Sequence, residues 1–156
     1  PRYQQFVSPI VQAVLNNQSP TDQGLDFGAG TGPVITKLLA DQGYKIKPYD
    51  PFFHNHPQLL NHTYDYIVCC EVIEHFHQPC NEFKLLKNLL KPGGHLYCMT
   101  YLYDPTLDFA DWFYKNDPTH VFFYQTQTLI YIKQNLQFSD LKVDGRLISF
   151  QSNHLD

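Results

Sequence analysis

Two glutamates and a histidine stand close together near the middle of the chain, in the segment Glu71-Val72-Ile73-Glu74-His75. If this segment turns helically, Glu71 and Glu74 lie on one face and His75 lies about one turn beyond Glu71. Two carboxylates and an imidazole at this spacing can share a single cation. The same residues can also cap a helix or support a loop without binding a metal. The residues alone leave both interpretations open.

A glycine-rich segment and one aspartate indicate a second kind of chemistry. The glycines of Gly28-Ala29-Gly30-Thr31-Gly32 lack the Cβ that would keep a ligand away from the backbone. A dinucleotide-binding fingerprint would need a further glycine where the chain has Pro33, so NAD takes second place. Asp50 follows about 20 residues later, where a carboxylate can accept both hydroxyls of a ribose. Together these residues predict a site for an adenosyl ligand.

Both groups of residues need a scaffold that carries distant segments to one edge. Short apolar runs bounded by turn residues predict strands at 24–27, 44–49, 64–72, 95–100, 141–144 and 147–151. Apolar positions at helical spacing predict helices over 8–17, 33–43 and 80–90. The first of these would have Ser8 as its cap and Pro9 as its first residue. Residues 52–63 are predicted to be irregular, and 101–135 to form a long connection.

The alternation of strands and helices predicts the fold class. It favours an α/β fold, a Rossmann-like doubly wound, mostly parallel sheet with helices on both faces and an antiparallel edge strand. The sequence contains no repeat and no linker rich in Gly or Ser, so residues 1–156 are expected to form a single domain. In such sheets ligands bind outside the carboxyl ends of the strands. The glycine-rich segment, Asp50 and the segment 71–75 are all expected at that edge.

Five segments in register carry a family resemblance. They are LDFGAGTG (25–32), YDPFF around Asp50, YDYIVCCEVIEHF (64–76), LLKPGGHLYCMT (89–100) and DPTHVFFYQTQTL (117–129). In these segments the chain resembles the class I S-adenosylmethionine-dependent methyltransferases, and it is similar in particular to the ubiquinone-biosynthesis O-methyltransferases. The segments follow the family's order over nearly the whole chain. The resemblance implies a methyltransferase that uses S-adenosylmethionine as its methyl donor.

The resemblance also implies which residues bind the donor. Asp50 would bind the ribose, and Cys70 would contact the donor through its backbone. The family usually supplies a further residue near the adenine from a third strand, of which this chain keeps only about 54–63. The residues that would face the methionine end are Asp26 and the backbone of Gly28, Ala29 and Gly30.

The segment EVIEH resembles that of the ubiquinone-biosynthesis O-methyltransferases and of the small-RNA 2′-O-methyltransferases, in which the two glutamates and the histidine bind a divalent metal. A further histidine follows in the RNA enzymes, and His120 of DPTH matches it. The resemblance thus implies a metal site for an ion such as Mg²⁺ formed by Glu71, Glu74, His75 and His120. It also makes His75 and His120 the candidates to take the acceptor proton, with or without metal.

The predicted function is therefore methyl transfer to a small-molecule acceptor, with oxygen the favoured acceptor atom. Two alternatives stay open: an RNA 3′-end 2′-O-methyltransferase, and a protein that binds an adenosyl ligand without turnover. The formal charge of −4, from 11 basic and 15 acidic residues, argues against nucleic acid as a general partner. No apolar run approaches the roughly 20 residues of a membrane span. The four cysteines form no CxxC pair, which fits free thiols in the cytoplasm; the oligomeric state is left open.

Aromatic residues are concentrated in the connection 101–124, which contains nine of them. Because this connection leaves the carboxyl end of a central strand, it is expected to lie over the donor and to line the acceptor pocket. For Phe109, Phe113 and Phe122, a place in the core of an ordinary helical insertion is an equally open interpretation. The aromatic residues predicted to reach the pocket are Trp112, Tyr114 and Tyr124.

Overall fold

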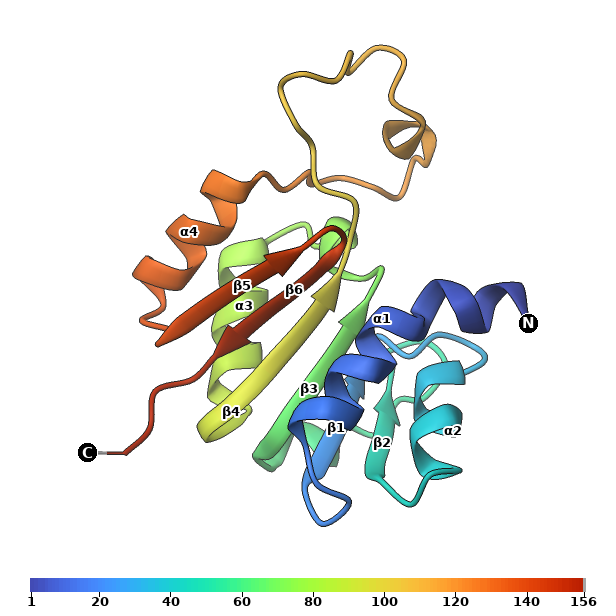
Figure 1. The fold of residues 1–156 in the computed structure, drawn as a ribbon, viewed down its shortest axis with the longest axis vertical. Coiled ribbons are helices and arrows are strands. Elements are labelled where there is room, and N and C mark those ends of the chain that lie inside the picture. Colours follow the sequence, from blue (N-terminus) through green and yellow to red (C-terminus); the bar gives the residue numbers. More distant parts are fainter. Residues whose placement is uncertain (156) are drawn as a thin grey trace.

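A six-stranded sheet forms the centre of the computed structural model, which describes residues 1–155 (Figure 1). Its order is β2-β1-β3-β4-β6-β5. The strands are β1 (Gln23–Phe27), β2 (Lys45–Tyr49), β3 (Tyr64–Cys70), β4 (Leu90–Met99), β5 (Asp140–Asp144) and β6 (Leu147–Gln151). The first four are parallel, whereas β6 runs antiparallel to both β4 and β5. The predicted α/β class is confirmed, and the antiparallel strand is β6, which lies between β4 and the edge strand β5.

The helices cover both faces of the sheet. They are α1 (Arg2–Asn17), α2 (Val34–Ala40), α3 (Pro79–Asn88) and α4 (Thr126–Asn135), with short 3-10 helices at η1 (Pro57–Asn61), η2 (Ile73–His75) and η3 (Phe113–Asn116). The first two helices lie on one face and the last two on the other (Figure 1). Among residues 1–155, no helix is both long enough and apolar enough to cross a membrane.

Strand β3 divides the core into two layers. Because successive side chains of a strand point to opposite faces, Tyr66 and Val68 pack with α1 and α2, while Ile67 and Cys69 pack with α3 and α4. All four side chains are fully buried. The nearly continuous apolar run predicted as a strand covered on both sides is therefore observed.

The start of α1 differs from the prediction. The helix begins at Arg2, so Pro9 lies inside it and Ser8 is not its cap. The buried face formed by Val7, Ile10 and Val11 continues across the proline and holds both halves of the helix on the core. Proline removes one helical hydrogen bond and bends the chain, and Figure 1 shows the two halves of α1 running in different directions.

Two further element boundaries were predicted wrongly. Strand β4 begins at Leu90 rather than at residue 95. Gly93 and Gly94, which were predicted as turn residues, lie within the strand, and the pairing of β4 with β3 shifts its register at this point. Gly93 has a φ of 75°, and a Cβ on Gly94 would lie 2.9 Å from the backbone oxygen of Lys91. In addition, the second half of the predicted connection forms α4.

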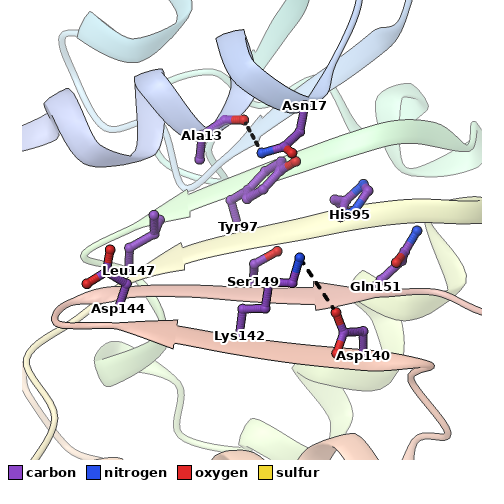
Figure 2. A pocket seen from close by; sticks show the side chains of 10 residues that line it. All are labelled: Ala13, Asn17, His95, Tyr97, Asp140, Lys142, Asp144, Leu147, Ser149 and Gln151. Carbon is purple, nitrogen blue, oxygen red and sulfur yellow. Dashed lines mark hydrogen bonds and ion pairs between the residues drawn. The ribbon is translucent and has the colours of Figure 1, made fainter.

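A polar groove opens on the α1 side of the sheet, where α1 covers β3 and β4 but leaves the β5–β6 hairpin uncovered (Figure 2). Its volume is about 180 Å³. The lining residues are Ala13, Asn17, His95, Tyr97, Asp140, Lys142, Asp144, Leu147, Ser149 and Gln151. This lining includes no residue of the predicted site.

The close packing of β1 on β3 gives a stability prediction. A Cβ on Gly24 would lie 2.2 Å from the ring of the fully buried Tyr66, whereas a Cβ on Gly32 would meet nothing within 4 Å. Gly24→Ala is therefore expected to lower the free energy of unfolding by about 1–3 kcal/mol through overpacking. Urea denaturation would measure this, with Gly32→Ala as the control. Equal stability of the two variants would contradict the packing described.

Candidate functional site

The loops after the parallel strands meet at one edge of the sheet, as the strand order requires (Figure 1). The glycine-rich loop follows β1, Asp50 follows β2 and the segment 71–75 follows β3. A Cβ on Gly28 would lie 2.5 Å from Val72, which stands between Glu71 and Glu74 in the sequence. The glycine-rich loop therefore touches the segment that carries the two glutamates.

The glycine-rich loop presents open backbone. Gly28 and Gly30 have φ values of 78° and 68°, which side chains with a Cβ rarely adopt. The amides of Gly28 and Ala29 donate to the Tyr49 carbonyl at 2.8 and 3.1 Å, which fixes the loop to β2. Cβ atoms on Gly30 and Gly32 would meet nothing within 4 Å. The outer side of the loop can therefore be approached closely by a ligand.

Asp50 links the glycine-rich loop to the loop after β2. Its Oδ2 accepts a hydrogen bond from the Gly30 amide at 3.0 Å, and its Oδ1 accepts from the amides of Phe52 and Phe53 at 2.9 and 3.2 Å. The side chain is buried, whereas the rings of Phe52 and Phe53 are 86% and 57% exposed. The structure thus brings Asp50 beside the glycine-rich loop and leaves two aromatic rings next to it.

Asp26 and Cys70 lie at the ends of β1 and β3, below the loops. Asp26 is buried and accepts a hydrogen bond from the Thr36 hydroxyl at 2.8 Å. Burial raises the pKa of Asp26 to about 6, against the lowering by this hydrogen bond. Burial, and then the charge of Glu71, also raise the pKa of the Cys70 thiol. The thiol is therefore protonated at neutral pH.

Three predicted metal ligands gather in the loop after β3. One ligand atom from each of Glu74, His75 and His120 can be chosen so that all lie within 4.8 Å of one another. Glu74 is fully buried, and its Oε2 has no hydrogen-bond partner among residues 1–155. The rings of His75 and His120 meet edge to face at 4.9 Å. A buried carboxylate beside two imidazoles is a donor set suited to a divalent ion.

The hydrogen bonds of the two histidines set their tautomers. Nδ1 of His75 lies 2.9 Å from the Thr119 carbonyl, and Nδ1 of His120 lies 2.6 Å from the Tyr114 carbonyl. Because a carbonyl oxygen can only accept, each Nδ1 carries the hydrogen and each neutral ring keeps its lone pair on Nε2. Metal-binding histidines are commonly held in this way. The Nε2 atom of His75 lies 3.9 Å from Glu74 Oε1 and that of His120 lies 3.5 Å from Asp117 Oδ2, and both can bind a cation or accept a proton.

The connection after β4 is attached to the cluster through its backbone. The amides of Val121 and Phe122 both donate to the Glu74 carbonyl, at 2.9 and 3.1 Å. This attachment brings His120 next to His75 although the two are far apart in the sequence. The pairing of these two histidines was predicted from the family resemblance.

Glu71 lies beside the cluster but is turned to other partners. The Tyr114 hydroxyl donates to Glu71 Oε2, and Glu71 Oε1 lies 3.5 Å from Nη1 of Arg146. Its backbone has a φ of 53°, which ends β3 two residues earlier than predicted. Burial, followed by the neighbouring Glu74, raises the pKa of Glu71 to about 8. The structure therefore groups three of the four predicted ligands and places the fourth next to them.

Sequence reasoning expected Tyr114 at the pocket but missed its partners, and it missed Arg146 altogether. The Tyr114 hydroxyl lies 2.7 Å from Glu74 Oε1 and 3.0 Å from the Thr100 hydroxyl, so it connects the two glutamates. The sequence placed Tyr114 in the aromatic connection but gave no sign of these partners. Arg146 comes from the β5–β6 turn, which no sequence motif links to the glutamates.

The aromatic connection forms a layer above the carboxyl ends of the strands (Figure 1). The core interpretation fails for Phe109 and Phe113, because these side chains are 42% and 61% exposed. The hydroxyl of the fully buried Tyr124 donates to the Ile73 carbonyl at 2.8 Å, so Tyr124 belongs to the core, where it borders an apolar pocket lined by residues of α3 and α4. Trp112 and Tyr114 are also buried, and only Tyr114 reaches the glutamates.

Comparisons with known proteins agree on one family. Residues 2–143 match a family model described as a methyltransferase domain. The ubiquinone biosynthesis O-methyltransferase of Vibrio cholerae is 31% identical over 77 residues, which cover 49% of this chain and 31% of that protein. The protein of the same name from Yersinia pestis is also 31% identical over 77 residues, covering 49% of this chain and 32% of its own. The match spans about a third of the length of these curated relatives.

Solved structures share the fold. A SAM-dependent methyltransferase from Archaeoglobus fulgidus superposes with a TM-score of 0.70 at 14% identity, covering 96% of this chain and 94% of that one. A 1,6-didemethyltoxoflavin-N1-methyltransferase from Burkholderia thailandensis, solved with 1,6-didemethyltoxoflavin and S-adenosylhomocysteine, has a TM-score of 0.65 at 16% identity. It covers 94% of this chain, and this chain covers 76% of it. At these identities the likeness confirms the Rossmann-like fold.

The buried carboxyl of Asp26 gives a prediction on pH and stability. The folded protein keeps the Asp26 proton up to about pH 6, whereas a carboxyl in the unfolded chain loses it near 3.8. The stabilisation from this extra proton is present below pH 4 and is lost as the pH rises through 6. The stability of the wild type relative to Asp26→Asn should therefore fall by up to about 3 kcal/mol across this range. Urea denaturation at several pH values would measure the difference, and parallel curves would contradict it.

Proposed function

The chain belongs to the methyltransferase domain family, and we propose that it transfers a methyl group from S-adenosylmethionine to a small-molecule acceptor, with oxygen the favoured acceptor atom. The observation that carries the proposal is the contact between the glycine-rich loop and the segment of the two glutamates, through Gly28 and Val72. With this contact, the proposed donor site and the proposed proton acceptors would lie side by side.

The donor would lie along the glycine-rich loop and Asp50. The carboxylate of Asp50 would accept the ribose hydroxyls, while the open backbone at Gly28, Ala29 and Gly30 would face the methionine end. Asp26 and the backbone of Cys70 would lie beneath that end. The exposed rings of Phe52 and Phe53 follow Asp50 directly and would supply an apolar surface for the adenine. This surface would take the place of the residue that the family usually supplies near the adenine, in the region where this chain keeps only about 54–63.

The reaction would be an in-line displacement. The acceptor oxygen attacks the methyl carbon, the bond from that carbon to sulfur breaks, and S-adenosylhomocysteine leaves with the electron pair on sulfur. The protein's main contribution would be to align donor and acceptor. The acceptor proton would pass to Nε2 of His75 or His120, since both Nδ1 atoms already donate to carbonyls and each Nε2 lies near a carboxylate that would stabilise the added charge.

A divalent metal such as Mg²⁺ fits the same residues. Glu74, with its unpartnered Oε2, His75 and His120 would hold it, and Glu71 is near enough to be a fourth candidate. When bound, such an ion would lower the pKa of the acceptor hydroxyl. In the metal-free arrangement the Nε2 atoms of the same two histidines accept the proton, whereas with a metal bound they would be its ligands, so the two versions give these atoms different roles.

The acceptor class is testable directly. Calorimetry with S-adenosylmethionine and S-adenosylhomocysteine should show binding, and a methyl-transfer screen over phenols, quinols and RNA ends should then show turnover on a small molecule. Turnover on RNA ends alone would support the 2′-O-methyltransferase alternative, against the formal charge of −4. Binding without turnover would support a ligand-binding protein, and no binding would overturn the proposal.

Substitution of Asp50 tests the donor site. Asp50→Asn keeps the size of the side chain but removes the charge that would receive the ribose hydroxyls. It should weaken S-adenosylhomocysteine binding by about 10- to 100-fold, as expected for lost hydrogen bonds to a charged group. Asp41→Asn, on an exposed aspartate at the end of α2, is the control. Equal affinities of the two variants by calorimetry would argue against the assigned ribose site.

The metal version makes a separate prediction. Titration of ligand-free protein with Mg²⁺, Mn²⁺ and Zn²⁺ should release or absorb heat with at least one ion. Glu74→Gln and His120→Ala should each lose most of this signal, because every ligand of a small site contributes to affinity. His77→Ala changes an exposed histidine next to the site and should leave the signal intact. No heat, together with full activity in chelator, would leave only the metal-free version.

A further inference from the structure

Arg146 reaches the candidate site from the opposite end of the sequence. It follows Gly145 in the turn of the β5–β6 hairpin, and its carbonyl accepts a hydrogen bond from the Thr100 amide at 3.2 Å. This bond anchors the turn at the carboxyl end of β4. The Arg146 side chain is 22% exposed and is therefore largely enclosed by its neighbours.

The guanidinium of Arg146 joins two segments that border the proposed donor site. Its Nη2 donates to the Phe6 carbonyl of α1 at 3.0 Å, and its Nη1 lies 3.5 Å from Glu71 Oε1. The Phe6 ring stacks on the guanidinium at 4.1 Å and the Tyr101 ring at 5.1 Å. Each of these contacts depends either on the positive charge of the guanidinium or on its planar shape.

The first half of α1 is suited to this attachment. Pro9 has no amide hydrogen, so the carbonyl of Gln5 lacks its helical donor, and the neighbouring Phe6 carbonyl accepts the bond from Arg146. On the same half, Phe6 packs against the same buried apolar cluster as Cys70, one of the residues assigned to the donor site. The first two turns of α1 therefore lie on the side of the sheet that borders Cys70.

We propose that Arg146 is a positioning residue of the methyl-transfer site, which fastens the first two turns of α1 over the donor by linking the Phe6 carbonyl to Glu71. The inference rests on the proposed function. Arg146 touches neither the glycine-rich loop nor Asp50 in the contacts above, so it acts through α1. Its loss should leave the alignment of the reacting atoms largely intact and should mainly shorten the time that the donor stays bound.

The test combines exchange and binding measurements on the full chain. Arg146→Met removes the charge at similar length, and Arg146→Lys keeps the charge but not the planar guanidinium. Lys142→Met, the control, removes an exposed charge from the same hairpin. In Arg146→Met, amide hydrogen exchange over residues 2–8 should quicken and S-adenosylhomocysteine should dissociate about tenfold faster. The KM for the donor should rise by a similar factor, with kcat changed less than about threefold.

The controls make the outcomes separable. Arg146→Lys should recover only part of the slow dissociation, and Lys142→Met should match the wild type. Unchanged dissociation in a folded Arg146→Met would overturn the positioning role even if exchange over residues 2–8 quickens, because the residue would then be merely structural. If the wild type itself binds no S-adenosylhomocysteine, the proposed function fails and the positioning role fails with it.

Discussion

The parallel pairing of β3 between β1 and β4 is the constraint on which the site depends. It sets Asp26 beside Val68 and Cys70 beside Met99, so the ends of three strands lie level. The chain then has to turn away at Glu71, whose positive φ and bond from its amide to the Met99 carbonyl mark an abrupt end to the strand. Side chains from three loops converge above this point because the strands beneath them are in register.

The buried Glu74 is the costly part of this arrangement. An unpaired carboxylate inside a protein is unfavourable by several kcal/mol, and Glu74 is fully buried with one oxygen unpartnered among residues 1–155. Tyr114, Thr100 and the attached connection compensate only in part. Polar groups left unsatisfied in an otherwise packed core are typical of sites that complete their bonding with a ligand.

Much of the fold could be predicted from the sequence, and the failures have identifiable causes. The run 64–70 alternates between two apolar layers, so its burial on both faces was readable. Pro9 misled the prediction of α1, because tertiary packing of Val7 and Ile10 outweighs the preference of proline for a first turn. The start of β4 was predicted too late for a similar reason. Gly93 has a positive φ, which is typical of a turn, but a strand can continue through such a residue as a bulge.

The site was predictable where local patterns carry the information. The glycine-rich loop and Asp50 come together through adjacent strands, so their spacing indicated them. Arg146 and the bonds of Tyr114 depend on which loops meet above the sheet, and neither spacing nor residue type indicates that. The exposed Phe109 and Phe113 show the same limit, because aromatic content alone does not say which rings of a loop turn inward.

A crystal structure of the protein with S-adenosylhomocysteine would test the central claim most directly. The account predicts that the ribose hydroxyls lie on the carboxylate of Asp50, that the glycine-rich loop runs along the homocysteine, and that the sulfur faces the cluster of Glu74, His75 and His120. A ligand bound elsewhere, or one whose sulfur points away from these three residues, would contradict the assignment of this edge of the sheet to methyl transfer.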